Sequence, residues 1–311
     1  MATEPGVTTF KVAPVAQQPG MVRFNAELAD YWALTKPEIN FLIAIATVTG
    51  FYLGCPTQLQ DFPFMRLIHT VLGTLLVASG AGTLNQYLER RFDAQMRRTR
   101  RRPLAAGRLK ASAAFWFGIV LSFAGATYLA VAVNPLTSLL AVLTLASYLL
   151  LYTPLKRKTP LCTIAGAFPG AMPPLIGWAA ASGTLSLEAW VLYAVLFLWQ
   201  FPHFMAIAWI YREDYSLAGY RVLPSGEGSG RFMSSQALVA SFALIPVSSI
   251  PTLLGSAGLV YLVAAFTLSL GFFFYSARLA FRRSNVAARR LLMASIIYLP
   301  LLFVVMAVNK L

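Results

Sequence analysis

Nine apolar stretches of about 20 residues dominate the sequence and restrict what the chain can fold into. A helix that crosses the roughly 30 Å hydrocarbon layer of a membrane needs about 20 such residues. The chain is 58% hydrophobic and only 12% charged over its 311 residues, whereas a soluble domain carries about 25% charged residues. We therefore predict an all-α integral membrane protein with nine transmembrane helices. The predicted spans are residues 38–55, 65–87, 112–133, 136–153, 162–182, 188–210, 235–253, 257–277 and 288–308.

The remaining composition excludes several other classes of protein. Two cysteines, Cys55 and Cys162, are too few for a disulfide framework or a cysteine-rich metal site. Two histidines, His69 and His203, are too few for a histidine cluster that binds a metal. Residues 1–28 are polar, rich in Pro and Gly, and contain no apolar run, so we predict a disordered tail rather than a cleaved signal peptide. Residues 29–311 are predicted to form one polytopic domain.

The basic residues follow a topological pattern. The net charge is +14, which in a soluble protein would suggest nucleic acid as a partner. Here 23 of the 25 Lys and Arg residues lie before the first predicted span or in every second connection, and only Arg66 and Lys310 lie on the other side. Cytoplasmic loops of membrane proteins carry this excess. We therefore expect a cytoplasmic N-terminus, a C-terminus outside, and no nucleic-acid partner.

Three residues near the end of the second predicted span form the first candidate site. Asn85, Glu89 and Asp93 stand four residues apart, and an arginine-rich segment follows them. At 100° per residue, positions with this spacing lie within about 80° of one another on one helical face. Two carboxylates and an amide oxygen suit a hard divalent cation such as Mg²⁺, and the arginines can hold an anion beside it. The alternative is a helix end with Glu–Arg pairs at the lipid headgroups.

A second acidic pair follows the sixth predicted span. By the topology above, Glu213 and Asp214 lie at the same membrane face as the first motif. Two acidic patches there can carry two Mg²⁺ ions that bridge a diphosphate, whose negative charge must be neutralised as it leaves an allylic carbon. The carbocation left behind needs a dry, aromatic-lined cavity. Candidates for that lining, each equally explained as a lipid-facing or interfacial residue, are Tyr148, Tyr152, Trp178, Trp199, Phe201 and Trp209.

Two further ionisable residues are candidates for substrate contact. His203 lies inside the sixth predicted span, where an ionisable side chain is a functional hypothesis by default and a packing role is the alternative. Lys36, followed by Pro37, opens the first span on the face where the diphosphate would lie. His69, near the outer start of the second span, is expected to be structural.

Together these motifs resemble the UbiA superfamily of intramembrane prenyltransferases. The superfamily pattern is Asn85-x₃-Glu89-x₃-Asp93 with a second acidic motif after the sixth span. Longer strings resemble the branch of this superfamily that farnesylates haem, and the likeness extends over about residues 30 to 308. These strings are Thr35-Lys36-Pro37, the run from Arg98 to Leu104, YTPLKRKTP (152–160), AMPPLIGW (171–178), WQFPHF (199–204) and REDYSLAGYRVLP (212–224).

The resemblance implies a fold, a reaction and a location. The fold would be nine helices around a central cavity, in a multi-pass protein of the bacterial inner membrane with its active site toward the cytoplasm. The reaction would be Mg²⁺-dependent transfer of a farnesyl group from farnesyl diphosphate to the 2-vinyl group of haem b, with addition of water, which gives haem O. The product would serve haem A synthase or terminal oxidase assembly.

The resemblance also assigns roles to residues. Asn85, Glu89 and Asp93 would bind Mg²⁺-diphosphate, and Asp214 would anchor the second acidic site. The diphosphate oxygens would be contacted by Lys36, Arg98 and Arg102. His203 is a candidate haem contact, because a neutral imidazole can ligate a haem iron or orient a propionate.

Two positions depart from the superfamily pattern. Glu89 stands where the superfamily usually has Asp, which keeps the charge and adds one methylene. Ala218 stands where the second motif usually has its second Asp, a departure that the haem-farnesylating branch tends to share. Three alternatives remain at this point: a related prenyltransferase for an aromatic or chlorin acceptor, a transporter, and a structural membrane subunit. Transporter sites usually lie at the midplane, whereas these acids gather at one face, and a structural subunit gives no reason for two aligned acidic clusters.

Overall fold

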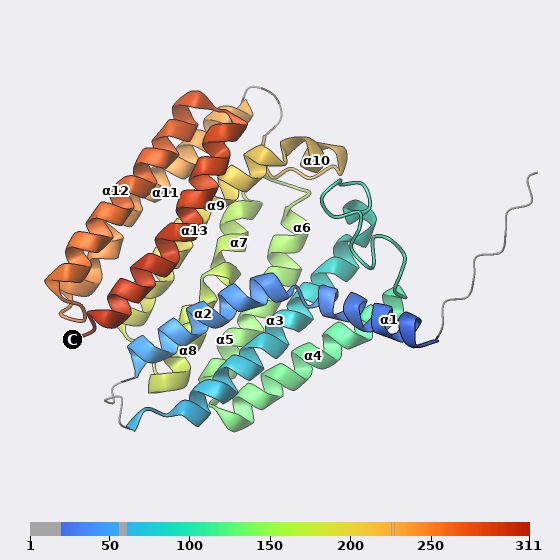
Figure 1. The fold of residues 1–311 in the computed structure, drawn as a ribbon, viewed down its shortest axis with the longest axis horizontal. Helices are drawn as coiled ribbons and strands as arrows, with labels where there is room; N and C mark the ends of the chain where they lie inside the picture. The colour runs from blue at the N-terminus through green and yellow to red at the C-terminus, as the bar shows by residue number, and fades with distance from the viewer. Residues whose placement is uncertain (1–19, 56–60, 225, 227) are drawn as a thin grey trace, which may run out of the picture.

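The computed structural model describes residues 20–55, 61–224, 226 and 228–311. Every element of regular structure in these residues is a helix, apart from one isolated bridge between Ala257 and Lys310. The helices pack side by side as a single bundle (Figure 1). The predicted all-α fold is confirmed.

Eight helical runs in the described residues are long and apolar enough to cross a membrane. Apolar side chains on the outside of these runs, such as Phe123, Val131 and Phe281, are 74–86% exposed, which suits lipid rather than water. The chain is thus a multi-pass membrane protein. The eight runs are α2 (Pro37–Gly54), α3 (Phe64–Asp93), α4 (Ala111–Ala132), the run Pro135–Leu155, α9 (Leu187–Ile210), α11 (Gly228–Leu253), α12 (Leu259–Arg282) and α13 (Asn285–Val308).

The run Pro135–Leu155 is not a uniform α-helix. It comprises α5 (Pro135–Ala146), a π-helical turn η2 (Ser147–Tyr152) and the short α6 (Thr153–Leu155). A π-turn places one extra residue in the helical turn and so re-aims the side chains that follow it. Such turns are frequent at functional sites.

The fifth predicted span, residues 162–182, is interrupted. It consists of α7 (Cys162–Gly170) and α8 (Met172–Ser182), and neither piece is long enough to cross a membrane alone. The chain nevertheless continues along the bundle, because the Ala171 N–H still donates to the Ala167 carbonyl at 3.1 Å. Prolines 169, 173 and 174 have no N–H to donate, which explains a break at this place. The count of nine spans therefore stays a prediction.

A short helix precedes the first span. Residues 1–19 of the predicted tail lie outside the described residues, whereas residues 20–28 belong to α1 (Gly20–Leu34). The end of this helix packs on the bundle, where the Tyr31 ring meets Phe117 edge-on at 5.0 Å and Leu34 is fully buried. Regular structure thus begins earlier than the composition of the tail predicts.

Glycines allow α2 and α8 to pack backbone to backbone. A Cβ atom added at Gly50 would overlap the Pro174 carbonyl, and one added at Gly177 would overlap the Thr47 carbonyl. Close packing of this kind drives helix association in lipid, where the hydrophobic effect between helices is lost. The contact fixes α2 against the interrupted span.

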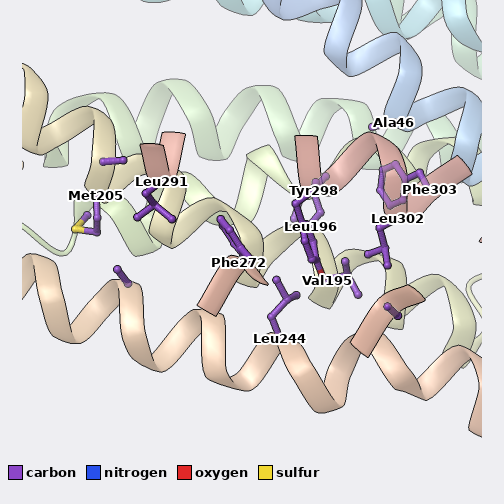
Figure 2. Packing of buried hydrophobic residues seen from close by; sticks show 14 of the residues in the cluster. Ala46, Val195, Leu196, Met205, Leu244, Phe272, Leu291, Tyr298, Leu302 and Phe303 are labelled. Atoms are coloured by element: carbon purple, nitrogen blue, oxygen red, sulfur yellow. The ribbon is translucent and has the colours of Figure 1, made fainter. Parts of the chain in front are cut away.

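The C-terminal half of the chain forms the largest apolar core. Side chains from α9, α11, α12 and α13, among them Leu196, Leu244 and Leu302, meet between these helices (Figure 2). Phe272 and Tyr298 stack at 5.1 Å within this core. The core contains no member of the two acidic motifs, which lie elsewhere in the bundle.

Two hollows lie outside the predicted site. One of about 180 Å³ is lined by Glu188 and Lys310, among others, and another of about 320 Å³ lies between α12 and α13. Neither is lined by a predicted metal, diphosphate or haem contact, and of the predicted aromatic lining residues Trp178 alone reaches one of them, the first.

Candidate active site

The first acidic motif lies on one buried face of α3, as its spacing predicts. Asn85 is 1% exposed, Glu89 is 6% exposed and Asp93 is 2% exposed. The three residues lie toward the end of the bundle that carries residues 93–111, 155–162 and 210–224, which we call the acidic end. Burial of two carboxylates is costly unless each is paired, so the partners of these side chains define the site.

Lys36 reaches the first motif residue from the turn between α1 and α2. Its Nζ donates to Asn85 Oδ1 at 2.8 Å. The Lys36 backbone is left-handed, with φ 54° and ψ 62°, a conformation that L residues seldom adopt and that the following Pro37 disfavours. The turn is held on α3 by Gln86, whose Nε2 donates to the Leu34 carbonyl at 3.0 Å. Burial lowers the pKa of the Lys36 ammonium, so this cation is both strained and desolvated.

Lys156 neutralises the second motif residue. Its Nζ donates to Glu89 Oε1 at 2.8 Å and to Oε2 at 3.1 Å, and it lies 4.5 Å from the centre of the Tyr152 ring. Burial alone would lower the pKa of Lys156, but the ring and the carboxylate outweigh it and raise that pKa above its ordinary value. The π-turn ends beside this pair, where Asn85 Nδ2 donates to Thr153 Oγ1 at 3.2 Å.

Arg102 neutralises the third motif residue. Its Nη1 donates to Asp93 Oδ2 at 2.8 Å, and the Thr99 hydroxyl donates to the Asp93 carbonyl at 2.9 Å. Both partners come from the connection of residues 94–110 between α3 and α4, which therefore folds back over the end of α3. Arg102, a predicted diphosphate contact, is thus at the site with its charge turned to the protein's own carboxylate.

Asp214 is brought to the same connection from α10 (Arg212–Leu217). Its Oδ2 accepts from the Arg98 backbone N–H at 3.2 Å, and Arg97 lies 3.8 Å from its other oxygen. Asp214 is 8% exposed, whereas the Glu213 side chain is 73% exposed and turns outward. The Arg98 guanidinium lies 5.2 Å over the Tyr211 ring rather than on a carboxylate. Of the acidic pair, only Asp214 joins the site.

The carboxylates are not gathered as a metal centre in this arrangement. Within the described ranges, no group of three or more His, Cys, Asp or Glu side chains lies close enough to hold one ion. Each carboxylate instead faces a basic side chain, namely Lys156 at Glu89, Arg102 at Asp93 and Arg97 at Asp214. The donor set itself, carboxylate oxygens plus the Asn85 amide oxygen, is the one that Mg²⁺ prefers. The ligand chemistry therefore fits Mg²⁺, provided that the basic side chains move aside.

His203 is bound to α13. Its Nδ1 lies 2.8 Å from Ser295 Oγ, and its ring stacks on Trp199 at 4.9 Å with an interplanar angle of 24°. Trp199 Nε1 donates to the carbonyl of the same Ser295 at 2.9 Å. His69, by contrast, contacts Tyr128 with its Nδ1 2.6 Å from the phenol oxygen, far from the acidic end.

The aromatic candidates do not form one lining. Tyr148 and Tyr152 pair at 5.5 Å beside Lys156. Phe201 is buried in a small core with Ala167 and Ala240. The others lie apart: Trp178 lines the hollow at the other end of the bundle, and Trp209 carries Arg212 on its ring.

Two residues at the site are not among the predicted ones. Lys156 enters the sequence analysis in the charge pattern and in the string YTPLKRKTP, but without a role at the site, although the Tyr152–Lys156 spacing of four at a helix end signals a cation held over a ring. Tyr220 is 7% exposed, and burial together with the Glu89 carboxylate raises the pKa of its phenol. The neighbouring Arg221 N–H donates to the Lys156 carbonyl at 2.8 Å, which joins the two connections.

Comparison with known proteins identifies the family to which this chain belongs. The model of the UbiA prenyltransferase family matches residues 43–299. The chain belongs to the UbiA prenyltransferase family. A member from Solibacter usitatus, called protoheme IX farnesyltransferase, is 48% identical over 91% of this chain and 99% of its own length.

Two solved structures share the UbiA fold. A digeranylgeranylglyceryl phosphate synthase matches 91% of this chain and 98% of its own with a TM-score of 0.74 at 17% identity. A UbiA homologue from Archaeoglobus fulgidus bound to GPP and Mg²⁺ matches 89% of this chain and 99% of its own with a TM-score of 0.58 at 16% identity. At these identities the likeness extends to the fold alone.

Proposed function

We propose that this chain converts haem b, farnesyl diphosphate and water into haem O and diphosphate, with the acidic end as the active site. The observation that carries the proposal is that four buried oxygen-bearing side chains of the two motifs are bound by basic side chains of the chain itself or, for Asp214, by a backbone N–H. These are Asn85, Glu89, Asp93 and Asp214, which are bound by Lys36, Lys156, Arg102 and the backbone of Arg98. Relatives called protoheme IX farnesyltransferase support haem as the acceptor.

The carboxylates would hold Mg²⁺ in the working enzyme. Asn85, Glu89 and Asp93 would bind from α3, and Asp214 would bind from α10. When bound, Mg²⁺ would neutralise the negative charge that develops on the departing diphosphate. The Archaeoglobus structure with GPP and Mg²⁺ supports this requirement for the family.

The basic residues would turn from the carboxylates to the diphosphate. Lys36, Lys156 and Arg102 already lie within hydrogen-bond distance of the motif oxygens, so a diphosphate entering between them needs only short side-chain movements. The Arg98 side chain lies over the Tyr211 ring, pairs with no carboxylate of the described residues, and would turn to a phosphate oxygen. This exchange keeps every buried charge paired in both states.

The chemistry requires no nucleophilic side chain. The carbon–oxygen bond of farnesyl diphosphate breaks, diphosphate leaves, and C1 of the farnesyl group accepts the electron pair of the haem vinyl group. The cation that forms beside the porphyrin is captured by water, which loses a proton and leaves a hydroxyethylfarnesyl group. The chain contributes position and electrostatic stabilisation, and the Tyr148–Tyr152 pair beside Lys156 supplies aromatic faces near the leaving group.

The charge topology supports an orientation in the membrane. We propose that the acidic end faces the cytoplasm of a bacterial inner membrane, because nearly all basic residues lie on that side. The N-terminus then lies in the cytoplasm and the C-terminus outside. The product would pass to a haem A synthase or to terminal oxidase assembly.

The test uses the full chain in liposomes with haem b, farnesyl diphosphate and Mg²⁺, and resolves porphyrins by chromatography and mass spectrometry. We expect a new haem of the hydroxyethylfarnesyl mass that fails to form when EDTA removes the metal. If phenolic or chlorin acceptors are prenylated and haem is left unchanged, the chain is a prenyltransferase of the same family with a different acceptor. Uptake of substrate without any product from folded protein would overturn the enzyme assignment.

A further inference from the structure

The Ser295 hydroxyl lies between two possible partners, the Leu292 carbonyl of its own helix and the His203 ring of α9. Ser295 Oγ donates its single hydrogen to the Leu292 carbonyl at 2.6 Å, a short bond within α13. The same hydroxyl lies 2.8 Å from His203 Nδ1. When its hydrogen points to the Leu292 carbonyl, the closer of the two partners, Ser295 Oγ accepts from His203 and Nδ1 carries the hydrogen.

The second ring nitrogen is then a free acceptor. In a neutral imidazole only one nitrogen carries hydrogen, so Nε2 presents a lone pair. Among the residues that the structure describes, none donates a hydrogen bond to His203 Nε2, and no carboxylate pairs with the ring to stabilise the imidazolium. His203 thus has the form of a metal-binding histidine whose other nitrogen is already oriented.

The ring is also held in place on its face. Trp199 stacks on His203, and its own N–H is fixed to the Ser295 carbonyl at 2.9 Å. Ser295 is completely buried, so one residue of α13 anchors both rings of α9. This arrangement restricts rotation of the imidazole before any ligand binds, which is the preorganisation that a ligand to a metal requires.

The depth of His203 agrees with that of the first acidic motif. It lies seven residues before the end of α9 at Ile210, about 10 Å along the helix at 1.5 Å per residue. Asn85 lies eight residues before the end of α3 at Asp93, a similar depth of about 12 Å. Counted along its own helix, His203 is therefore about as far from the end of α9 as Asn85 is from the end of α3.

We propose that Ser295 is a positioning residue that fixes His203 as the Nδ1–H tautomer, so that Nε2 serves as an axial ligand to the iron of the porphyrin acceptor. This inference rests on the proposed function, because it takes haem as the acceptor. It assigns to α13 a part in acceptor binding that neither acidic motif can supply.

The experiment measures haem binding without the farnesyl donor. Purified full-length chain in detergent is titrated with ferric haem b, and absorption and electron paramagnetic resonance spectra report whether a histidine ligates the iron. We expect the histidine signature in the unchanged chain. His203→Ala should lose it, and added imidazole should restore it.

Variants of Ser295 separate positioning from simple packing. Ser295→Ala should weaken haem binding about tenfold or more, the usual effect of removing the partner of a metal-binding histidine, whereas Ser295→Thr keeps a hydroxyl and should bind nearly as well as the unchanged chain. Ser276→Ala is the matched control, because Ser276 is equally buried and, within the part of the chain that the structure describes, donates only to the Phe272 carbonyl of its own helix at 3.0 Å.

The outcomes distinguish a failure of this inference from a failure of the proposed function. If haem is farnesylated but the histidine signature is missing, or if it persists in His203→Ala, the inference is wrong and the proposed function stands. If Ser295→Ala binds haem as well as Ser276→Ala does, Ser295 has no positioning role. If haem is neither bound nor farnesylated while another acceptor is, the proposed function fails and this inference fails with it.

Discussion

The two ends of the bundle use polar side chains in different ways. At the acidic end, buried carboxylates meet cations from distant parts of the chain, as in the pairs of Glu89 with Lys156 and Asp93 with Arg102. At the opposite end, which carries Cys55, residues 182–187 and the C-terminus, a basic side chain binds backbone groups instead. Lys310 Nζ, for example, donates to the carbonyls of Tyr52 and Cys55 at 2.8 and 2.6 Å, where α2 ends.

This difference suggests separate roles, with the acidic end serving the reaction and the contacts toward the opposite end serving stability. A cation on helix-end carbonyls stabilises the fold directly. A buried ion pair contributes little net stability, because the desolvation of both charges offsets their attraction. The acidic end also contains the left-handed Lys36 and the π-turn before Lys156, two features that are costly or rare. We therefore expect changes at the acidic end to reduce the rate, and changes at the helix contacts toward the opposite end to reduce stability.

The largest effect is expected from Asp93→Asn. This change removes a charge from the diphosphate site and should lower the rate of haem O formation at least about a hundredfold, as loss of a key electrostatic contact does. Folding should change little, because Arg102 is 27% exposed and can remain hydrated. Rate and thermal unfolding are measured on the same preparation. Asp30→Asn is the control, since Asp30 pairs with Arg108 at the same end but outside the site. Full activity of Asp93→Asn would remove the metal assignment.

Lys156→Met should reduce both the stability of the chain and the rate of the reaction. It leaves Glu89 buried without its cation, which should lower the free energy of unfolding by about 3 kcal/mol and also slow the reaction. Lys158→Met provides the comparison, because Lys158 lies two residues away and is exposed. Equal behaviour of the two variants in unfolding and in rate assays would show that the Lys156–Glu89 pair has no special role.

Gly177→Val should reduce stability without altering the rate per folded molecule. Its side chain would overlap the Thr47 backbone and separate α2 from α8, at a cost of about 1–3 kcal/mol. Gly271→Val is the matched control, because a Cβ there meets no atom of the described residues within 4 Å. A rate defect in Gly177→Val at full folding would contradict the division between the two ends.

The smallest expected effect is the difference in stability between Lys36→Gly and Lys36→Ala. Both remove the ammonium from Asn85 and should lower the rate alike. Because glycine adopts φ 54° without strain, the glycine variant should be more stable than the alanine variant by about 1 kcal/mol. Equal unfolding temperatures would mean that the turn at Lys36 stores no strain.

Much of this fold can be predicted from the sequence, because lipid imposes simple rules. The apolar runs predict the spanning helices, and the spacing of Asn85, Glu89 and Asp93 predicts their common face. The break at Ala171 is harder to predict, since prolines within a span are compatible with a kink as well as an interruption. The helix α1 packs on the bundle only through residues at its end, such as Tyr31 and Leu34, so the biased composition before them gives little sign of it.

The pairings within the site are beyond sequence reasoning. Glu89 and Lys156 are 67 residues apart, and His203 and Ser295 are 92 apart, so only the packed bundle brings them together. The sequence predicts a guanidinium of Arg98 at the diphosphate, whereas its backbone N–H is what reaches Asp214. The proposed roles of Arg98, Arg102 and Lys36 at a diphosphate stay predictions.

We expect the carboxylates to accept a metal only when a diphosphate draws their cations away. This is tested by measuring Mn²⁺ binding to the purified chain by electron paramagnetic resonance, with and without farnesyl diphosphate and without haem. Because binding of Mn²⁺ and binding of farnesyl diphosphate are coupled, we expect farnesyl diphosphate to tighten Mn²⁺ binding to the chain about tenfold or more, after the affinity of free farnesyl diphosphate for Mn²⁺ is subtracted. Asp93→Asn should lose this gain. Equally tight Mn²⁺ binding with and without farnesyl diphosphate would show that the diphosphate does not free the carboxylates for the metal.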